Sequence, residues 1–302
     1  MATNDILKRF TFDNTHVRGE LVGLNQTLTD IFARQTYAQP VQDLLSELLA
    51  AAALLTATVK MEGLLTLQIQ GEGPIRLLQA EASHDGKLRG IARLNDDYDA
   101  DTLEAALLGD SILSKKGSLI ITIDPDQGRR YQGIVPLEGD DIAACLEGYF
   151  KQSEQLDTRI WLSSENGIAA GFLLQELPKL GEIQEELEVD EDAWNRLTQL
   201  GNTIRDDELL HLESEDILHR LYHEETVRLY DDEPMQFNCS CSKQRLSNAL
   251  MQIGFAECQD IIQEQTKIRA DCEFCGQHYS FSQTDIDELF PLESGKAGKG
   301  LH

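Results

Sequence analysis

Apolar and polar residues alternate in several short stretches of the first hundred positions, which is the pattern of half-buried β-strands. The alternation runs through residues 10–12, 65–69, 75–82 and 88–94. The last two stretches are joined by Asp85-Gly86, a dipeptide typical of tight hairpin turns. The pattern therefore predicts an antiparallel meander.

One longer stretch has helical spacing. Pro40 is suited to a first helical turn, and apolar residues recur after it every three to four positions. They are Leu44, Leu45, Leu48, Leu49, Ala52, Leu55 and Val59. The uncharged run 48–59 is too short for a membrane span, so we expect the core helix of a globular domain.

Further hairpins complete this first domain. We expect strand pairs at 118–123 with 131–135 and at 159–163 with 168–177, a short helix near 103–108 and a helix over 141–152. Strands paired in hairpins, with few helices between them, predict an α+β domain over residues 1–178, built of antiparallel sheets with helices.

The character of the chain changes over residues 179–232, which hold 17 acidic and 5 basic residues. Apolar residues in this segment keep helical spacing, and Asp190 and Ser214 are placed as N-caps. Such helices need a surface to dock on, and their like charges oppose compaction. We expect an acidic helical linker of low intrinsic stability, although an ordinary solvated connector has the same pattern.

The segment 233–294 carries four cysteines, Cys239-Ser-Cys241 and, after a gap of 30 residues, Cys272-Glu-Phe-Cys275. Helices are expected over 243–253, ended by Gly254, and over 256–265, with a hairpin of 267–270 and 278–281 that bears Cys272 and Cys275 at its turn. The tail is residues 295–302. Two short sulfur pairs are typical of one tetrahedral Zn²⁺ site, which is the cofactor we expect, at one ion per chain.

Charge restricts the class of partner. The 302-residue chain has 53 acidic and 26 basic residues, a formal charge of -27. That field repels phosphate backbones and anionic membranes, so we expect neither nucleic acid nor membrane partners. No export signal is recognisable at the N-terminus, which predicts a cytoplasmic protein whose cysteines do not form a disulfide framework.

Other interpretations of the cysteines stay open. A static structural zinc site in a constitutive interaction protein fits the spacing, and a thiol-disulfide oxidoreductase using Cys272 and Cys275 is a second alternative. The oxidoreductase is disfavoured because its motif is not expected at a strand-to-helix junction. Cys145 and Cys258 fit buried positions on helix faces, and their roles stay open. His219 and His223 have the spacing of a helical metal pair but lack the glutamate of the zinc-protease motif.

Several segments together resemble the bacterial redox-regulated chaperones, the family of thirty-three-kilodalton heat-shock holdases. In this sequence they are Leu64-Leu-Thr-Leu-Gln-Ile-Gln-Gly71, Tyr131-Gln-Gly-Ile-Val-Pro-Leu-Glu-Gly139, Tyr149-Phe-Lys-Gln-Ser-Glu-Gln155, Leu221-Tyr-His-Glu-Glu225, Phe237-Asn-Cys-Ser-Cys-Ser242 and Cys272-Glu-Phe-Cys275. The resemblance covers nearly the whole chain, and all four cysteines match.

The resemblance implies a holdase that works without ATP and is not an enzyme. The reduced, zinc-bound form would be inactive. Oxidation would form the disulfides Cys239–Cys241 and Cys272–Cys275, release the zinc, unfold the C-terminal redox-switch module and the linker, and yield a homodimer that binds unfolding clients. Clients would then pass to ATP-dependent foldases. Disulfides that close such short loops restrict the unfolded chain very little, so they would not replace the stability supplied by the ion.

Overall fold

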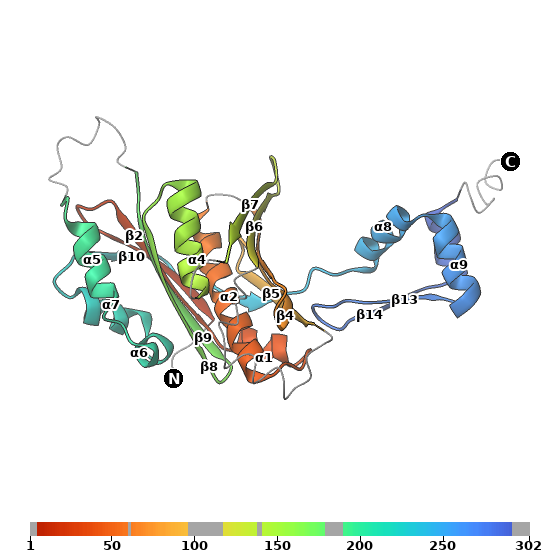
Figure 1. The fold of residues 1–302 in the computed structure, drawn as a ribbon, viewed down its shortest axis with the longest axis horizontal. Coiled ribbons are helices and arrows are strands. Elements are labelled where there is room, and N and C mark those ends of the chain that lie inside the picture. Colours follow the sequence, from red (N-terminus) through yellow and green to blue (C-terminus); the bar gives the residue numbers. More distant parts are fainter. Residues whose placement is uncertain (1–4, 60–61, 96–116, 138–140, 179–189, 292–302) are drawn as a thin grey trace. The chain divides into compact units, whose positions relative to one another are not determined.

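The computed structural model describes residues 5–59, 62–95, 117–137, 141–178 and 190–291. The chain divides into two compact units, Met1–Asn238 and Cys239–His302, and Figure 1 labels many of their elements. The helix expected near 103–108, the linker's first residues 179–189 and the tail 295–302 lie outside the described residues.

The described residues of the first unit form two sheets of six strands each. Sheet A has the order β10-β1-β2-β9-β8, and β11 also pairs with β1. Its four long strands are antiparallel: β1 (Ile6–Phe12), β2 (Val17–Leu24), β8 (Thr158–Glu165) and β9 (Ile168–Glu176). They confirm the strands expected from the alternation at residues 10–12 and the hairpin of 159–163 with 168–177.

Sheet B has the order β12-β5-β4-β3-β6-β7. The meander is antiparallel and comprises β3 (Gly63–Gln70), β4 (Ile75–Ser83), β5 (Lys87–Leu94), β6 (Ser118–Pro125) and β7 (Tyr131–Pro136). These strands were all expected, because the alternating residues 65, 67 and 69 face the core and the polar positions between them are less buried.

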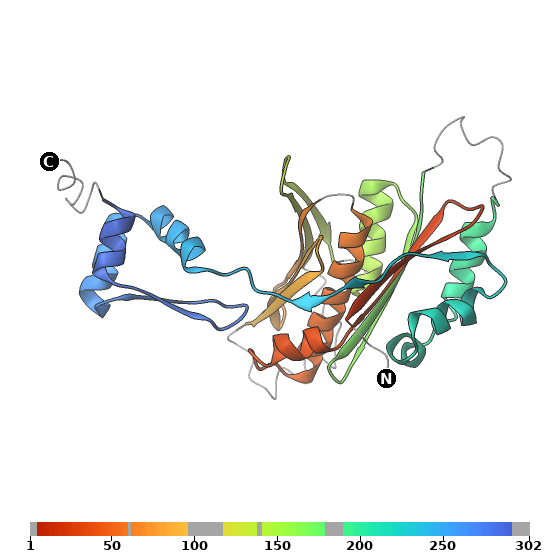
Figure 2. The ribbon, with the colours of Figure 1, turned by 180° about the vertical axis from the view of Figure 1, so that it is seen from behind.

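Helix α2 (Gln39–Thr58) lies between the two sheets (Figures 1 and 2). Pro40 is in its first turn, and its leucines and alanines form the centre of the larger core, together with α1 (Gln26–Phe32), α4 (Ile142–Tyr149) and the π-helical turn η1 (Phe150–Glu154). Among the described residues, α2 alone is apolar and long enough to pass as a membrane span, but 61% of that segment is buried in the protein. The expected core helix is confirmed.

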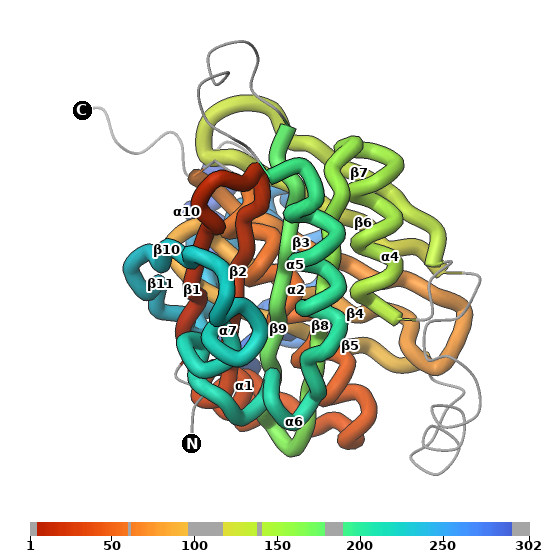
Figure 3. Tube along the Cα trace, turned by 90° about the vertical axis from the view of Figure 1, so that its left-hand side faces the viewer, coloured from red at the N-terminus to blue at the C-terminus, as the bar shows by residue number. Residues whose placement is uncertain are grey.

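The described part of the linker, residues 190–232, contains three short helices, α5 (Ala193–Gly201), α6 (Asp206–His211) and α7 (Ser214–Tyr222), which cover the face of sheet A opposite α2 (Figure 3). Their apolar residues, among them Leu197, Leu218 and Tyr222, form a second core with Phe10 and Phe172 of the sheet. Docking on this surface supplies the burial that short helices of like charge lack alone.

The predicted N-caps of the linker helices are wrong by one or two positions. Asp192 stands at the N-cap position of α5 without a side-chain capping hydrogen bond, whereas the carboxylate of Asp190 accepts a hydrogen bond from the Asp192 amide at 3.0 Å. Glu213 precedes α7, so Ser214 is its first residue. Several acidic or hydroxyl residues stand near each start, and sequence alone does not choose between adjacent capping residues.

After α7 the chain becomes an extended strap, residues 227–238, instead of continuing as helix. Its first strand, β10 (Val227–Leu229), and its second, β11 (Glu233–Pro234), both pair antiparallel with β1. Leu229 is opposite Phe10, and Glu233 is opposite Leu7, so the pairing register shifts by one residue between the two strands. The strap therefore contains a bulge.

The strap's third strand, β12 (Gln236–Phe237), joins sheet B in parallel beside β5. The Gln236 amide donates to the Gly86 carbonyl at 2.9 Å, and a Cβ atom at Gly86 would lie 2.1 Å from the Pro234 carbonyl oxygen. Only glycine permits this close approach. Residues 233–238, which we expected in the C-terminal module, thus belong with the first unit, because they pair with strands of both sheets.

The second unit is small. It contains α8 (Lys243–Ile253), α9 (Phe255–Gln265), the hairpin of β13 (Ile268–Asp271) and β14 (His278–Phe281), and α10 (Gln283–Leu289), which was not predicted. Gly254 ends α8 with a φ of 101°, as expected from its position. Its core of buried residues is Leu250, Cys258, Ile262, Ile268, Phe281, Ile286 and Phe290. A core of this size gives little stability by itself.

Candidate metal centre

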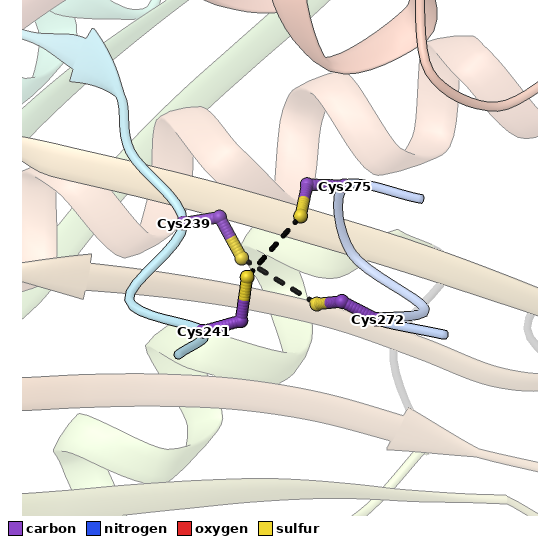
Figure 4. A group of neighbouring side chains, drawn as sticks. All are labelled: Cys239, Cys241, Cys272 and Cys275. Atoms are coloured by element: carbon purple, nitrogen blue, oxygen red, sulfur yellow. Dashed lines mark hydrogen bonds between the residues drawn. The ribbon is translucent and has the colours of Figure 1, made fainter. Parts of the chain in front are cut away.

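The four predicted cysteines meet at one point of the second unit (Figure 4). Cys239 and Cys241 lie between the end of the strap and α8, while Cys272 and Cys275 lie in the turn of the β13–β14 hairpin. In that turn the Gly276 amide donates to the Cys272 carbonyl at 2.7 Å. Gly276 has a φ of 70°, a conformation in which glycine is unstrained, and the turn brings both sulfurs to one side.

The distances between the sulfurs fit a tetrahedral metal. Cys239 Sγ lies 3.6 Å from Cys272 Sγ, and Cys241 Sγ lies 3.4 Å from Cys275 Sγ. All four sulfurs are within 4.8 Å of one another. Zinc–sulfur bonds of about 2.3 Å in a tetrahedron place the sulfurs about 3.8 Å apart. The donor set is thus soft, four-coordinate and of the right size for Zn²⁺.

Burial and crowding oppose ionisation of the Cys272 and Cys275 thiols in the absence of a cation. Burial is the main cause that raises the pKa of Cys275 to about 12, and the neighbouring sulfurs add to it. Burial likewise raises the pKa of Cys272. Several thiolates held this close repel one another, and a divalent cation reverses the effect by favouring the anions. The geometry is therefore that of a site whose cysteines are held as thiolates when a cation is bound.

Neighbouring polar groups hold the site in place. The Tyr279 hydroxyl donates to Cys241 Sγ at 3.2 Å. Ser242 caps α8 by accepting a hydrogen bond from the Arg245 amide at 3.2 Å, and the Arg245 guanidinium bonds to the Ser240 hydroxyl. No sequence motif points to Tyr279, except that it follows Cys275 by four residues on the next strand. Partners of this kind orient metal ligands and limit their motion.

The other sulfurs and the imidazoles do not join the cluster: His219 lies on α7, His223 follows that helix, and neither belongs to the four-cysteine group. Cys258 is buried in the small core of the second unit, with its sulfur 3.7 Å from the Leu250 carbonyl, and Cys145 is buried in the core around α2. His278 is exposed and contacts Asp271, with Nδ1 2.6 Å from Oδ1. Over the ranges that the structure describes, the four cysteines are the one group of three or more His, Cys, Asp or Glu placed to hold a metal ion.

A family model described as Hsp33 protein matches residues 5–282 of this sequence. The chain belongs to the Hsp33 family. Its relatives include proteins named "33 kDa chaperonin" from Pseudomonas paraeruginosa, 45% identical over 291 residues that cover 96% of each chain, and from Ectopseudomonas mendocina, 46% identical over 95% of each chain. Family membership confirms the resemblance found in the sequence motifs.

The Hsp33 fold is also found in a crystal structure. The heat shock protein 33 homolog of Thermotoga maritima superposes with a TM-score of 0.78, covering 96% of this chain and 99% of that chain. At 22% identity this likeness concerns the fold alone. The expected α+β class, with sheets, helices and a C-terminal cluster of cysteines that is able to hold a metal ion, is confirmed for this member of the Hsp33 family.

Proposed function

We propose that this protein is a cytoplasmic, ATP-independent holdase whose binding of unfolding client proteins is switched on by oxidation of the four cysteines. The relatives named chaperonin match this chain over nearly their full length. That match supports a chaperone and not an enzyme. The observation that supports a redox switch is the position of the cysteine cluster. Cys239 directly follows the strap that covers edge strands of both sheets.

In the reduced state we propose that Cys239, Cys241, Cys272 and Cys275 hold one Zn²⁺. The bound ion would stabilise the four thiolates and cross-link the start of the second unit to its hairpin. Structural zinc contributes roughly 10–16 kcal/mol in small peptides, which is as large as the stability of a typical domain. Over its described residues 239–291 the second unit has seven buried residues in its core, so its fold would depend on the intact set of ligands.

Oxidation removes those ligands in a balanced reaction. Each disulfide forms from two thiolates that give up two electrons, and one molecule of hydrogen peroxide accepts them, with two protons, to become water. Two peroxides therefore convert four thiolates into two disulfides. Without thiolate donors the site no longer binds the ion, and the second unit loses most of its stability.

We propose that the disulfides are Cys239–Cys241 and Cys272–Cys275. All four sulfurs are within 4.8 Å of one another, so distance in the folded site does not select the pairing. The two pairings differ in consequence. A bond between the two segments would close a long loop and keep the unit cross-linked, whereas bonds within each segment close loops of a few residues and stabilise little. Unfolding on oxidation requires disulfides within each segment.

Unfolding of the second unit would then release the strap and the linker helices. The apolar surface under α5, α6 and α7 includes Phe10, Phe12 and Phe172, all buried while the linker is docked. An exposed apolar surface of this kind binds unfolding chains and favours association of two copies. We therefore propose that the active form is a homodimer that holds clients until ATP-dependent foldases accept them.

One oxidation time course tests the proposal. Released zinc, free thiols and suppression of aggregation of a heat-unfolded client are measured on the same samples after peroxide is added to the zinc-loaded protein. We expect about four thiols lost and one zinc released per chain, with activity rising in parallel. Equal activity before and after peroxide would refute the switch, and catalytic turnover of dithiol substrates would favour the oxidoreductase.

A further inference from the structure

The outer edge of strand β1 pairs with the strap. Its other edge pairs with β2 from Ile6 to Thr11. Its outer edge pairs with three residues of β10 and two of β11, and in the described part of the chain no other strand borders it. Release of the strap therefore exposes a row of unpaired backbone donors and acceptors.

Backbone hydrogen bonds hold the strap at this edge, and Met235 is its one buried side chain. The Tyr230 amide donates to the Arg9 carbonyl at 3.0 Å, the Asp13 amide to the Thr226 carbonyl at 3.0 Å, and the Met235 amide to the Asp5 carbonyl at 2.7 Å. Leu229 and Tyr230 remain 42% and 47% exposed. An edge that binds a strand mainly through its backbone tolerates many side-chain sequences.

Basic side chains on β1 add a preference for acidic residues in the segment that binds at this edge. Lys8 contacts Glu215 of α7 and Asp232 of the strap, and Arg9 pairs with Glu233 of the strap. Lys8 is 8% exposed and lies on the same face of β1 as Phe10. Once the strap and α7 leave, the edge presents two cations beside aromatic side chains, in a protein whose formal charge is -27.

We propose, on the basis of the proposed function, that the oxidised protein captures clients by strand addition at the outer edge of β1. The occupant is an extended client segment in which apolar residues stand next to acidic ones, as they do in the strap sequence Leu229-Tyr-Asp-Asp-Glu233. In the reduced protein the strap is the built-in occupant of the same edge. This assigns β1 the role of client receptor and the strap the role of its competitor.

Peptides with the strap sequence 227–238 provide a direct probe. In an antiparallel pair alternate residues face the partner, and the bonds at Thr226 and Tyr230 show that the amides of Arg228 and Tyr230 face β1. The amides of Val227 and Leu229 point away. A fluorescent peptide N-methylated at Arg228 and Tyr230 is therefore blocked, and one methylated at Val227 and Leu229 is its matched control.

We expect the oxidised full-length protein to bind the unmodified and control peptides, and the blocked peptide at least about tenfold more weakly, which corresponds to about 1.4 kcal/mol. Zinc-loaded reduced protein binds none, because the strap occupies the edge. A fourth peptide, with amides in place of Asp231, Asp232 and Glu233, binds more weakly than the unmodified one. Equal binding of the blocked and control peptides overturns strand addition, and equal binding of the amide peptide overturns the charge preference.

A competition experiment tests whether clients bind at the outer edge of β1. Saturating control peptide is added to oxidised protein before the heat-unfolded client, and we expect suppression of aggregation to be lost, while the blocked peptide leaves it intact. Full client holding in the presence of saturating control peptide overturns β1 as the receptor. Failure of the redox switch has a separate signature, since oxidised protein without any peptide would then neither release zinc nor hold the client.

Discussion

The sulfur of Cys239 lies 3.6 Å from the sulfur of Cys272, across two segments that are far apart in sequence. Cys241 and Cys275 approach in the same way at 3.4 Å. Each close pair joins the residues that follow the strap to the turn of the β13–β14 hairpin. Loss of any one sulfur therefore weakens the connection between these two segments, and with it the fold of the second unit.

Replacement of one ligand is the simplest test of that dependence. We expect Cys272→Ser to bind less than one tenth of the zinc of wild type, because hydroxyl oxygen is a poor donor for this soft site. The second unit then unfolds without oxidant, and the reduced variant suppresses aggregation. Zinc content and activity are measured together. Cys145→Ala, in the core around α2, is the control and keeps both zinc and regulation; a zinc-loaded, inactive Cys272→Ser would contradict the assignment of the ligand.

The ion pairs of Lys8 supply a second prediction. Burial disfavours the charge of Lys8, but its hydrogen bonds to Glu215 and Asp232 outweigh that effect and raise its pKa. In Lys8→Met both acids stay half-exposed and solvated, while the link to the strap is lost. We expect the docked strap to lose about 1–2 kcal/mol. Hydrogen exchange at the Tyr230 and Met235 amides of the zinc-loaded protein reports the loss.

A matched variant separates this effect from a general change of charge. Arg205 is 65% exposed and pairs with Asp207 on α6, so Arg205→Met removes a solvent-screened pair. We expect no change in protection of the strap amides. If Lys8→Met behaved like Arg205→Met, the ion pairs of Lys8 would not contribute to docking.

The helix α5 tests whether the linker has a stability of its own. Leu197 is fully buried against sheet A, so Leu197→Ala should cost about 2–4 kcal/mol of linker docking. We expect chaperone activity of the zinc-loaded variant to appear at a lower temperature than in wild type. Leu200→Ala, at a partly buried position of the same helix, should shift that temperature much less. Identical shifts would mean that docking of α5 does not limit activation.

A buried acid gives the stability a pH dependence. Glu20 is 2% exposed, and among the described residues its Oε2 has no hydrogen-bond partner. Burial raises its pKa from 4.5 to about 7, against the opposing charges of Arg18 and Arg9. Between these two values the folded protein keeps a proton that the unfolded chain has released. Stability therefore falls as the pH rises through this window and is constant above it.

Glu20→Gln removes that titration. At pH 8 we expect the variant to be more stable than wild type by about 2–3 kcal/mol, with the difference shrinking toward pH 4.5. Urea unfolding of zinc-loaded protein at several pH values measures it. The variant Glu62→Gln, which changes an exposed glutamate, is the control. A stability difference that did not change with pH would show that Glu20 does not titrate in this range.

The sequence predicted the elements whose pattern is long enough to be periodic. The apolar repeat of α2 recurs over several helical turns, alternation marks long strands such as those at 75–82 and 88–94, and the four cysteines carry their own chemistry. The strap was missed because β10 has three residues and β11 two, one of them Pro234. Proline argues against a strand, yet Pro234 is opposite Ile6 between the hydrogen-bonded positions, where no amide is needed. Pairing with the edge strands β1 and β5, and not a local sequence pattern, accompanies the extended conformation of this segment.

The one-residue shift between β10 and β11 divides the strap into two parts with separate registers. A chain paired in one continuous register detaches as a single cooperative element, whereas a bulge allows each side to open alone. The part next to Cys239, with β11 and β12, is then free to detach while β10 stays on β1. The response to oxidant is therefore expected to be graded, with an intermediate in which half of the receptor edge is open and the linker helices are still docked.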